Sequence, residues 1–272
     1  MDPAAAFAHL VDRGDGRSGR SAPVGLDRAA WCIAAAARGE AAFDPDAAVD
    51  ALDQLATRCP ASDFAALSTW LFVTEGFRGN RADYGDPRNS YLPDVLDRRL
   101  GIPITLTVVM METGRRIGID VVGIGMPGHF LAGDPTTPGR YCDPFHGGAR
   151  LGVEDCARRY AEVFGSTEGF RPGLLHPVDD LRILDRMLAN LQHHALRNSR
   201  RDLIWIARFR LRIPDRDPLD AEALVALLVE AGGFGAAREE YERLLGDAEA
   251  RDDAAAVARI GRHRVAAQAR SN

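Results

Sequence analysis

The chain has 272 residues, of which 46% are hydrophobic and 27% are charged. This composition supplies enough apolar material for one sizeable core and a smaller helical module. The net charge of -5 argues against nucleic acid or an anionic membrane as the partner, because both are met by a basic surface. The most hydrophobic stretch, 104–111, is far too short to cross a bilayer, and the N-terminus lacks an apolar signal region. We therefore expect a globular, cytoplasmic protein.

All 34 basic residues are arginines. The guanidinium group suits phosphate recognition, but the abundance of Ala, Gly and Asp favours codon bias as the explanation. We interpret arginine pairs such as Arg115-Arg116 as solvated helix ends. The four cysteines match neither a zinc ribbon nor a redox pair and fit a reducing compartment; they are Cys32, Cys59, Cys142 and Cys156.

Residues 1–23 include a Gly-, Arg-, Ser- and Asp-rich cluster and are predicted to form a flexible tail. From Leu26 to Leu71, apolar residues recur at steps of three and four, which predicts three amphipathic helices. Asp44-Pro45 and Ser62-Asp63 are plausible starts for the second and third helices.

Residues 76–100 are polar and rich in Gly, Pro and Asn, and we expect a shaped loop that ends in a short helix. Pro103 and Gly118 are suited to open and close a buried helix over 104–117. The β-branched content of 119–126 is typical of a strand.

A β-hairpin is predicted from two short alternating runs, 128–132 and 140–144, which are separated by a turn cluster. If Gly133 faces Gly139, His129 lies opposite Asp143, with Cβ atoms about 5 Å apart. Cys142 then faces away, because side chains alternate along a strand.

The C-terminal part is predicted to be helical. A helix follows Leu151 as far as Phe164, and a Gly- and Pro-rich loop leads to a weak repeat. In this repeat Arg200 and Phe234 occupy equivalent turn positions 34 residues apart, the tetratricopeptide period. Two such repeats need caps, and 252–269 has the pattern of a capping helix.

His129 and Asp143 together match the base and the orienting carboxylate of a nucleophilic triad. The missing part is a thiol at the start of a nearby helix. Residues 101–109 offer only Thr105 and Thr107, which are far weaker nucleophiles than a thiolate and are better explained as capping or packing residues. Strand parity excludes Cys142 as a substitute.

Two other interpretations of this pair stay open. His129, Asp143 and His146 would make a two-His, one-carboxylate metal site, although three such residues spread over strands and a loop are a common accident. The pair would also serve as a buried contact that only rigidifies the hairpin. We expect neither a metal nor a cofactor.

Three segments resemble the SirB-type family, bacterial proteins with a transglutaminase-like domain and a tetratricopeptide tail: GFRGNRADYGDPRNSYLPDVLDRRLGIPITL, GIGMPGHFL and CDPFHGG. The resemblance covers roughly Leu26 to Leu245. It implies an α+β fold with a papain/transglutaminase-like core, N-terminal helices and a C-terminal helical module. In the wider superfamily a catalytic cysteine opens a helix, and His and Asp follow on adjacent strands. His129 and Asp143 match the last two, but 101–107 holds no cysteine.

The expected organisation is a tail (1–23), a transglutaminase-like domain (24–175), tetratricopeptide-like repeats (176–250) and a capping helix with a short tail (251–272). We expect a non-enzymatic binding or regulatory protein whose repeats take a protein or peptide partner. Its domain would keep a groove for which we predict four binding residues, Asn80, Asn89, Tyr91 and His146, beside His129 and Asp143.

The alternative expectation is a hydrolase or acyltransferase that acts on an amide or ester. Its predicted catalytic residues are His129 as general base, Asp143 as the orienting carboxylate, and Thr105 or water as the attacking group.

Overall fold

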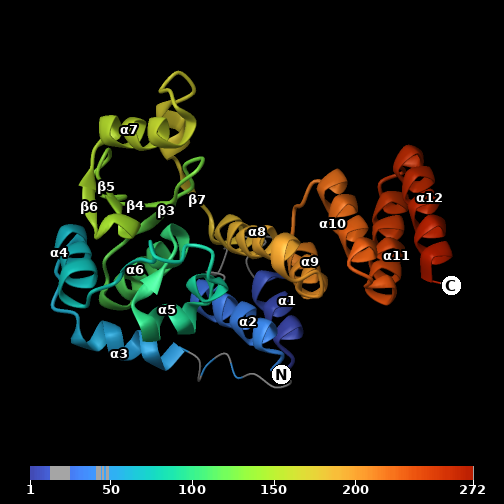
Figure 1. Cartoon of the computed structure of the whole chain (residues 1–272), viewed down its shortest axis with the longest axis horizontal. Helices are drawn as coiled ribbons and strands as arrows, with labels where there is room; N and C mark the ends of the chain where they lie inside the picture. The colour runs from blue at the N-terminus through green and yellow to red at the C-terminus, as the bar shows by residue number, and fades with distance from the viewer. Residues whose placement is uncertain (13–24, 41–43, 45, 47–48, 272) are drawn as a thin grey trace.

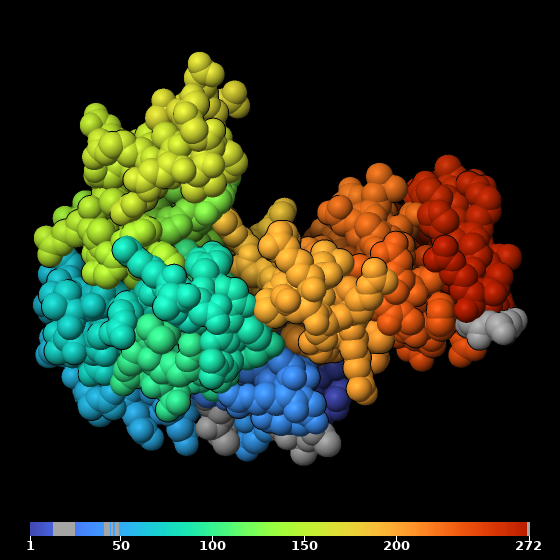
Figure 2. Space-filling model, in the orientation of Figure 1, coloured from blue at the N-terminus to red at the C-terminus, as the bar shows by residue number. Residues whose placement is uncertain are grey.

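A computed structural model describes residues 1–12, 25–40, 44, 46 and 49–271 of the chain. Within this part, helices dominate and surround one small antiparallel sheet, so the α+β class is confirmed (Figure 1). A row of C-terminal helices extends to one side of the main body (Figure 2).

The N-terminal helices are α1 (Pro3–Asp12), α2 (Leu26–Arg38), α3 (Asp50–Arg58) and α4 (Phe64–Thr69), the last of which runs into a π-helical turn, Trp70–Thr74. The three predicted helices are therefore confirmed. Asp63 caps α4, since its carboxylate accepts a hydrogen bond from the Ala66 N–H at 2.8 Å. The predicted start at Pro45 lies outside the described residues.

The prediction of a flexible tail is wrong for residues 3–12, which form α1. Phe7 is fully buried, and its ring centroid lies 4.7 Å from that of Phe209. Ala6, Phe7 and Val11 bury one face of this helix, which is enough apolar surface to hold it against α2 and α9. Residues 13–23 of the predicted tail lie outside the described part.

The polar loop is held by a short parallel pair that the sequence did not predict, β1 (Arg78–Gly79) with β2 (Leu100–Gly101). Between these strands lie a 3-10 turn, Pro87–Ser90, and α5 (Leu92–Arg98), the expected short helix. Helix α6 (Pro103–Ile117) follows and ends at Gly118, whose φ of 77° suits glycine.

The sheet has the order β6-β5-β4-β3-β7, with every neighbouring pair antiparallel. Its strands are β3 (Val122–Ile124), β4 (Leu131–Gly133), β5 (Tyr141–Asp143), β6 (Ala149–Leu151) and β7 (Pro177–Val178). Helix α6 packs with Ala132 and Cys142 on one face. Helix α7 (Val153–Phe164) covers the other face, where Leu131 and Tyr141 lie.

The predicted hairpin is confirmed as β4-β5, but its predicted register is wrong by two residues. Gly133 pairs with Tyr141 rather than with Gly139. The connecting loop explains the difference, because Asp134 closes it: its N–H donates to the Arg140 carbonyl at 3.1 Å, and its carboxylate accepts from the Thr136 hydroxyl at 2.6 Å. A shift of two keeps each side chain on its predicted face.

The C-terminal helices are α8 (Asp180–Asn198), α9 (Asp202–Arg212), α10 (Pro218–Glu230), α11 (Phe234–Ala250) and α12 (Ala254–Ser271). The core does not break at residue 175, because α8 and α9 bury Leu188 and Phe209 in the cluster that also holds α2 and α6. A second cluster joins α9 to α12, and α12 packs on α11 where a capping helix was expected.

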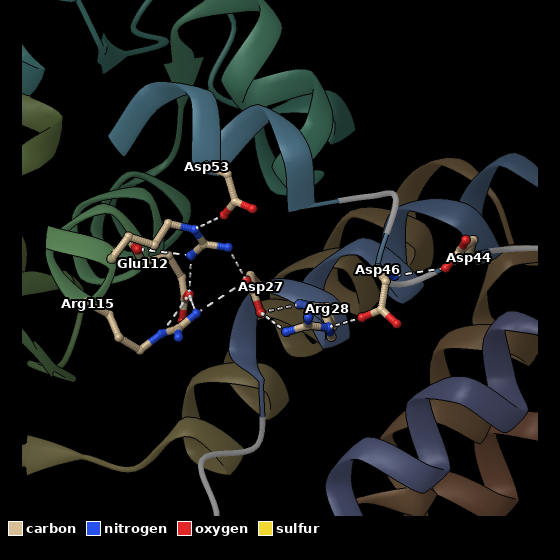
Figure 3. Close-up of polar contacts among 8 residues, drawn as sticks. Asp27, Arg28, Asp44, Asp46, Asp53, Glu112 and Arg115 are labelled. Carbon is tan, nitrogen blue, oxygen red and sulfur yellow. Dashed lines mark hydrogen bonds and ion pairs between the residues drawn. The ribbon is translucent and has the colours of Figure 1, made fainter. Parts of the chain in front are cut away.

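Arg116 corrects the interpretation of the arginine pairs as solvated helix ends. Its side chain is only 11% exposed, and it lies 2.5 Å from the buried Asp27 carboxylate and 2.5 Å from that of Asp53. Arg116 thus ties α6 to α2 and α3, and Figure 3 shows Arg115 of the same helix between Glu112 and Asp27 of α2.

Among the described residues, no helix is long and apolar enough to span a membrane.

Candidate functional site

His129 is carried by a tight turn that leads into β4. Gly128 has a φ of 74°, which favours glycine, and the His129 N–H donates to the Met126 carbonyl at 3.1 Å. Arg186 reaches across from α8 and donates to the carbonyls of Met126 (3.0 Å) and His129 (2.8 Å). The backbone of His129 is therefore fixed from two sides.

Asp143 ends β5 and caps the 3-10 turn Pro144–His146. Its Oδ1 accepts from the His146 N–H at 3.2 Å, which folds the His146 ring back so that Nδ1 lies 2.7 Å from Oδ2. The carboxylate is fully buried, whereas the His146 side chain is 26% exposed. Local sequence thus brings His146 to the same oxygen that faces His129.

The contact between His129 and Asp143 is short but poorly aligned. Nε2 of His129 lies 3.0 Å from Oδ2 of Asp143. The atom is nevertheless buried without a well-directed hydrogen-bond partner among the described residues. Arg159 of α7 approaches the same oxygen, with Nε at 3.4 Å. Two imidazoles and one guanidinium therefore converge on a single carboxylate oxygen.

Asp143 is an anion in this setting. Burial on its own would raise the pKa of its carboxyl, but the close approach of the His129 ring and the hydrogen-bonded His146 ring hold that pKa below its ordinary value. An ionised carboxylate here can orient an imidazole or hold a cation.

None of the four cysteines, all of which lie in the described part, is an activated thiol. Burial raises the pKa of Cys32, Cys142 and Cys156 to about 12, and it also raises that of Cys59. As strand parity predicts, Cys142 faces away from the site, and its Sγ lies 3.1 Å from the Ser68 hydroxyl on the α6 side of the sheet.

Thr105 is placed as a helix cap. Its fully buried hydroxyl lies 2.7 Å from the Asn89 carbonyl and accepts from the Ile102 N–H at 3.2 Å. No contact joins it to His129 within the described residues. Thr105 therefore has a structural task at the start of α6, and its predicted role as attacking group gains no support.

Asn80 and Asn89 shape the polar loop from inside. The Asn80 side-chain amide donates to the Asn89 side-chain oxygen at 3.0 Å, and the Asn89 amide donates to the Asp83 carbonyl at 2.8 Å. Tyr91 packs against the core, and burial raises its pKa to about 12. These three residues hold the loop in shape, and none of them touches His129 in the described contacts.

The polar loop contacts the site through three aromatic rings in a row, those of Tyr84, Phe145 and His146, which we call the ring row. Tyr84 packs edge-on against Phe145 with centroids 5.7 Å apart, and Phe145 packs against His146 at 5.3 Å. Sequence reasoning missed Phe145, although it stands inside the CDPFHGG segment. It also missed Arg159 and Arg186, for which no local signal exists, because each reaches the site from a distant helix.

A surface cavity of about 710 Å³ lies between this loop and α8. Tyr84 lines it, so it adjoins the ring row, but His129 and Asp143 do not line it. Its other walls combine polar and apolar surface and come from residues 83, 85–88, 90 and 102 and from Asn190, Leu191, His193, His194, Arg197 and Asn198.

His129, from the turn before β4, and Asp143, at the end of β5, meet beside an antiparallel sheet that has a helix on each face, which defines an α+β protein with a His and Asp pair at the sheet. The chain belongs to the transglutaminase-like superfamily, whose family model matches residues 37–189.

Curated relatives carry the name UPF0162 protein. The one from Xylella fastidiosa is 40% identical over 166 residues, 59% of this chain and 58% of the relative, so the chain spans little more than half of that protein's length. The one from Pseudomonas aeruginosa is 29% identical over 229 residues, 80% of this chain and 76% of the relative. F-box only protein 21 of Mus musculus is 30% identical over 135 residues, 46% of this chain and 21% of the relative. No solved structure matches.

Proposed function

We propose that the chain is a non-enzymatic binding protein of the SirB type. In this proposal the transglutaminase-like domain recognises a polypeptide segment, and the C-terminal helices act as a tetratricopeptide-like extension of that surface. The unpaired state of all four cysteines supports a reducing compartment, and we place the protein in the cytoplasm.

The observation that carries this proposal is that neither the cysteine thiols nor the Thr105 hydroxyl is activated as a nucleophile. Acyl transfer in this superfamily needs a thiolate beside the imidazole, and every thiol of the chain has a raised pKa. The Thr105 hydroxyl is committed to backbone groups. Among the described residues, the His and Asp pair therefore has neither an activated thiol nor a free Thr105 hydroxyl beside it.

The cavity between the polar loop and α8 supports the choice of a polypeptide as the ligand. Its walls combine Tyr84, the exposed His193, the half-buried His194 and Arg197, whose guanidinium has no described ion-pair partner. Asp86 on the loop side is held by two guanidinium groups, with Arg88 at 2.8 Å and Arg98 at 3.1 Å, whereas Asp83 has no ion pair among the described contacts. The remaining donors, above all Arg197, suit the carbonyls and carboxylates of an extended chain.

A peptide-display selection against the full-length protein tests the proposal, followed by affinity measurements on variants. We expect Tyr84→Ala and Arg197→Ala to weaken the selected peptides about tenfold or more, the usual effect of removing a central contact. Arg208→Ala, an exposed arginine on α9 outside the cavity, is the matched control and should bind normally. Enrichment of no peptide, or equal losses in Arg197→Ala and Arg208→Ala, would overturn the proposal.

The second candidate function is hydrolysis or acyl transfer with His129 as base. The 3.0 Å approach of its Nε2 to Asp143 is the observation in its favour, because this contact leaves Nδ1 free of any described partner. A panel of amide and ester substrates should then be turned over by the wild type and not by His129→Ala. Equal rates in the two proteins would remove this candidate.

A further inference from the structure

Three potential metal ligands meet on the α7 side of the sheet. Nε2 of His129, Oδ2 of Asp143 and Nδ1 of His146 all lie within 4.8 Å of one another. They come from the turn before β4, the end of β5 and the 3-10 turn that follows. Hydrogen bonds to the backbone of His129 and His146 and the pairing of β5 with β6 fix all three segments, so the group is largely arranged before any ion arrives.

The distances suit an ion after a small movement. The two nitrogens lie 3.0 and 2.7 Å from Oδ2. Ligand atoms around a tetrahedral ion with bonds of about 2.1 Å stand about 3.4 Å apart. Both separations must therefore widen, by about 0.4 Å at His129 and about 0.7 Å at His146, and the His146 ring, which is 26% exposed, has room to rotate outward.

One nitrogen of the group, Nε2 of His129, is buried although no hydrogen bond among the described residues satisfies it. Nε2 of His129 is buried and points near Oδ2 without forming an aligned hydrogen bond. Buried polar atoms without partners are costly, and those in native proteins call for a specific cause. A cation between Nε2 and Oδ2 supplies that cause, because it turns a misdirected contact into two ligand bonds.

We propose that His129, Asp143 and His146 form a binding site for a divalent transition-metal ion of the zinc type. Two imidazoles and a carboxylate are borderline ligands that select Zn²⁺, Co²⁺, Ni²⁺ or Fe²⁺ over Mg²⁺ and Ca²⁺. Three protein ligands leave at least one coordination position, which water or a donor atom of a bound polypeptide fills. This inference goes beyond the proposed peptide cavity, whose lining contains none of the three ligands.

Arg159 opposes the ion and so provides a specific test. Its Nε lies 3.4 Å from the same Oδ2, where its positive charge repels a cation. Its Nη1 is held 2.9 Å from Glu162, one turn along α7. Replacing Arg159 by Gln removes the charge while all three ligands stay, so the variant should bind the metal more tightly than the wild type does.

Titration of Zn²⁺ into chelator-treated, full-length protein provides the main measurement. We expect one ion per chain and a loss of about tenfold or more in affinity for His146→Ala, since even groups that only orient ligands contribute about 10- to 100-fold. His176→Ala, which changes an exposed histidine outside the group, is the matched control and should bind as the wild type does.

Co²⁺ adds a readout that a purely structural role would not change. Its visible absorption bands, which depend on direct coordination, should appear in wild type and Arg159→Gln and be lost in His146→Ala. Equal Zn²⁺ affinity in wild type and His146→Ala would overturn the site. Failure of Arg159→Gln to bind more tightly would also overturn it, and this variant keeps the test decisive if His146→Ala folds poorly.

Discussion

Two clusters of buried carboxylate groups lie in different parts of the fold and are neutralised in different ways. At the junction of α2, α3 and α6, Asp27 and Glu112 are met by guanidinium groups, with Arg116 at 2.5 and 2.8 Å (Figure 3). At the end of β5, Asp143 is met mainly by the imidazoles of His129 and His146.

The kind of cationic partner determines what each cluster can do. We call the first cluster, formed by Asp27, Glu112 and Arg116, the clamp. Guanidinium groups keep their charge at all relevant pH values and offer several donors, so the junction has one stable state. Imidazole groups change charge near neutral pH and can exchange a proton for a metal. At the second cluster, Nε2 of His129 stays buried without an aligned hydrogen-bond partner among the described residues.

The largest predicted effect is at the clamp. Arg116→Met leaves Asp27 and Glu112 facing each other in the core without their main partner. Breaking a buried ion pair in this way costs about 3–5 kcal/mol, which urea unfolding would measure. Arg115→Met is the control. Because the Arg115 side chain is half exposed, its replacement should lower the free energy of unfolding clearly less. A loss below about 1 kcal/mol in Arg116→Met would show that the junction is not a clamp.

Arg186 supports the second cluster in another way, because its hydrogen bonds go to backbone carbonyls and not to a carboxylate. Arg186→Met removes two hydrogen bonds from a charged donor to the carbonyls of Met126 and His129. At about 1.5 kcal/mol for each such bond, the expected loss is about 3 kcal/mol. The imidazole NMR signals of His129 should also shift. Unchanged His129 signals would contradict the positioning role of α8.

Opposite pH responses should distinguish the two clusters. The pKa of Asp143 is lowered, so its contribution to stability is present above its ordinary value of 3.8 and is lost as the pH falls through the lowered pKa. Burial and then the charge of Asp27 raise the pKa of Glu112. Its contribution is present below its ordinary value of 4.5 and is lost as the pH rises through the raised pKa.

Unfolding curves of Asp143→Asn and Glu112→Gln between pH 3 and 8 would measure this contrast. Asp143→Asn should cost about 2 kcal/mol near neutral pH, and the difference from wild type should shrink in acid. Glu112→Gln should remove the loss of stability that accompanies rising pH. If both variants changed the same limb of the profile, the assignment of opposite pKa shifts would be wrong.

Local signals explain what the sequence could predict. The helices 26–38 and 103–117 and the hairpin follow from periodicity, proline and glycine, all of which act within a few residues. The contact between His129 and Asp143 was also accessible, because strand parity survived a register error of two residues.

The contacts that the sequence did not predict join residues that are distant along the chain. Arg116 was interpreted as solvated, because nothing near it indicates Asp27, which lies 89 residues away. The same limit hid Arg159 and Arg186, each of which reaches the site from a helix of its own. Helix α1 was missed for a different reason: the polar cluster that follows it led us to interpret all of 1–23 as a tail, and Phe209, which covers Phe7, is distant along the chain.

The smallest predicted effect lies at the rim of the clamp, where Arg28 pairs with Asp46 at 2.8 Å (Figure 3). The two side chains are 36% and 82% exposed, so water screens the attraction. Arg28→Ala should therefore cost less than about 1 kcal/mol, and added salt should reduce the difference further. Urea unfolding at low and high ionic strength would check this. A loss comparable to that of Arg116→Met would mean that burial does not separate the rim from the centre, and the contrast between clamp and surface would fail.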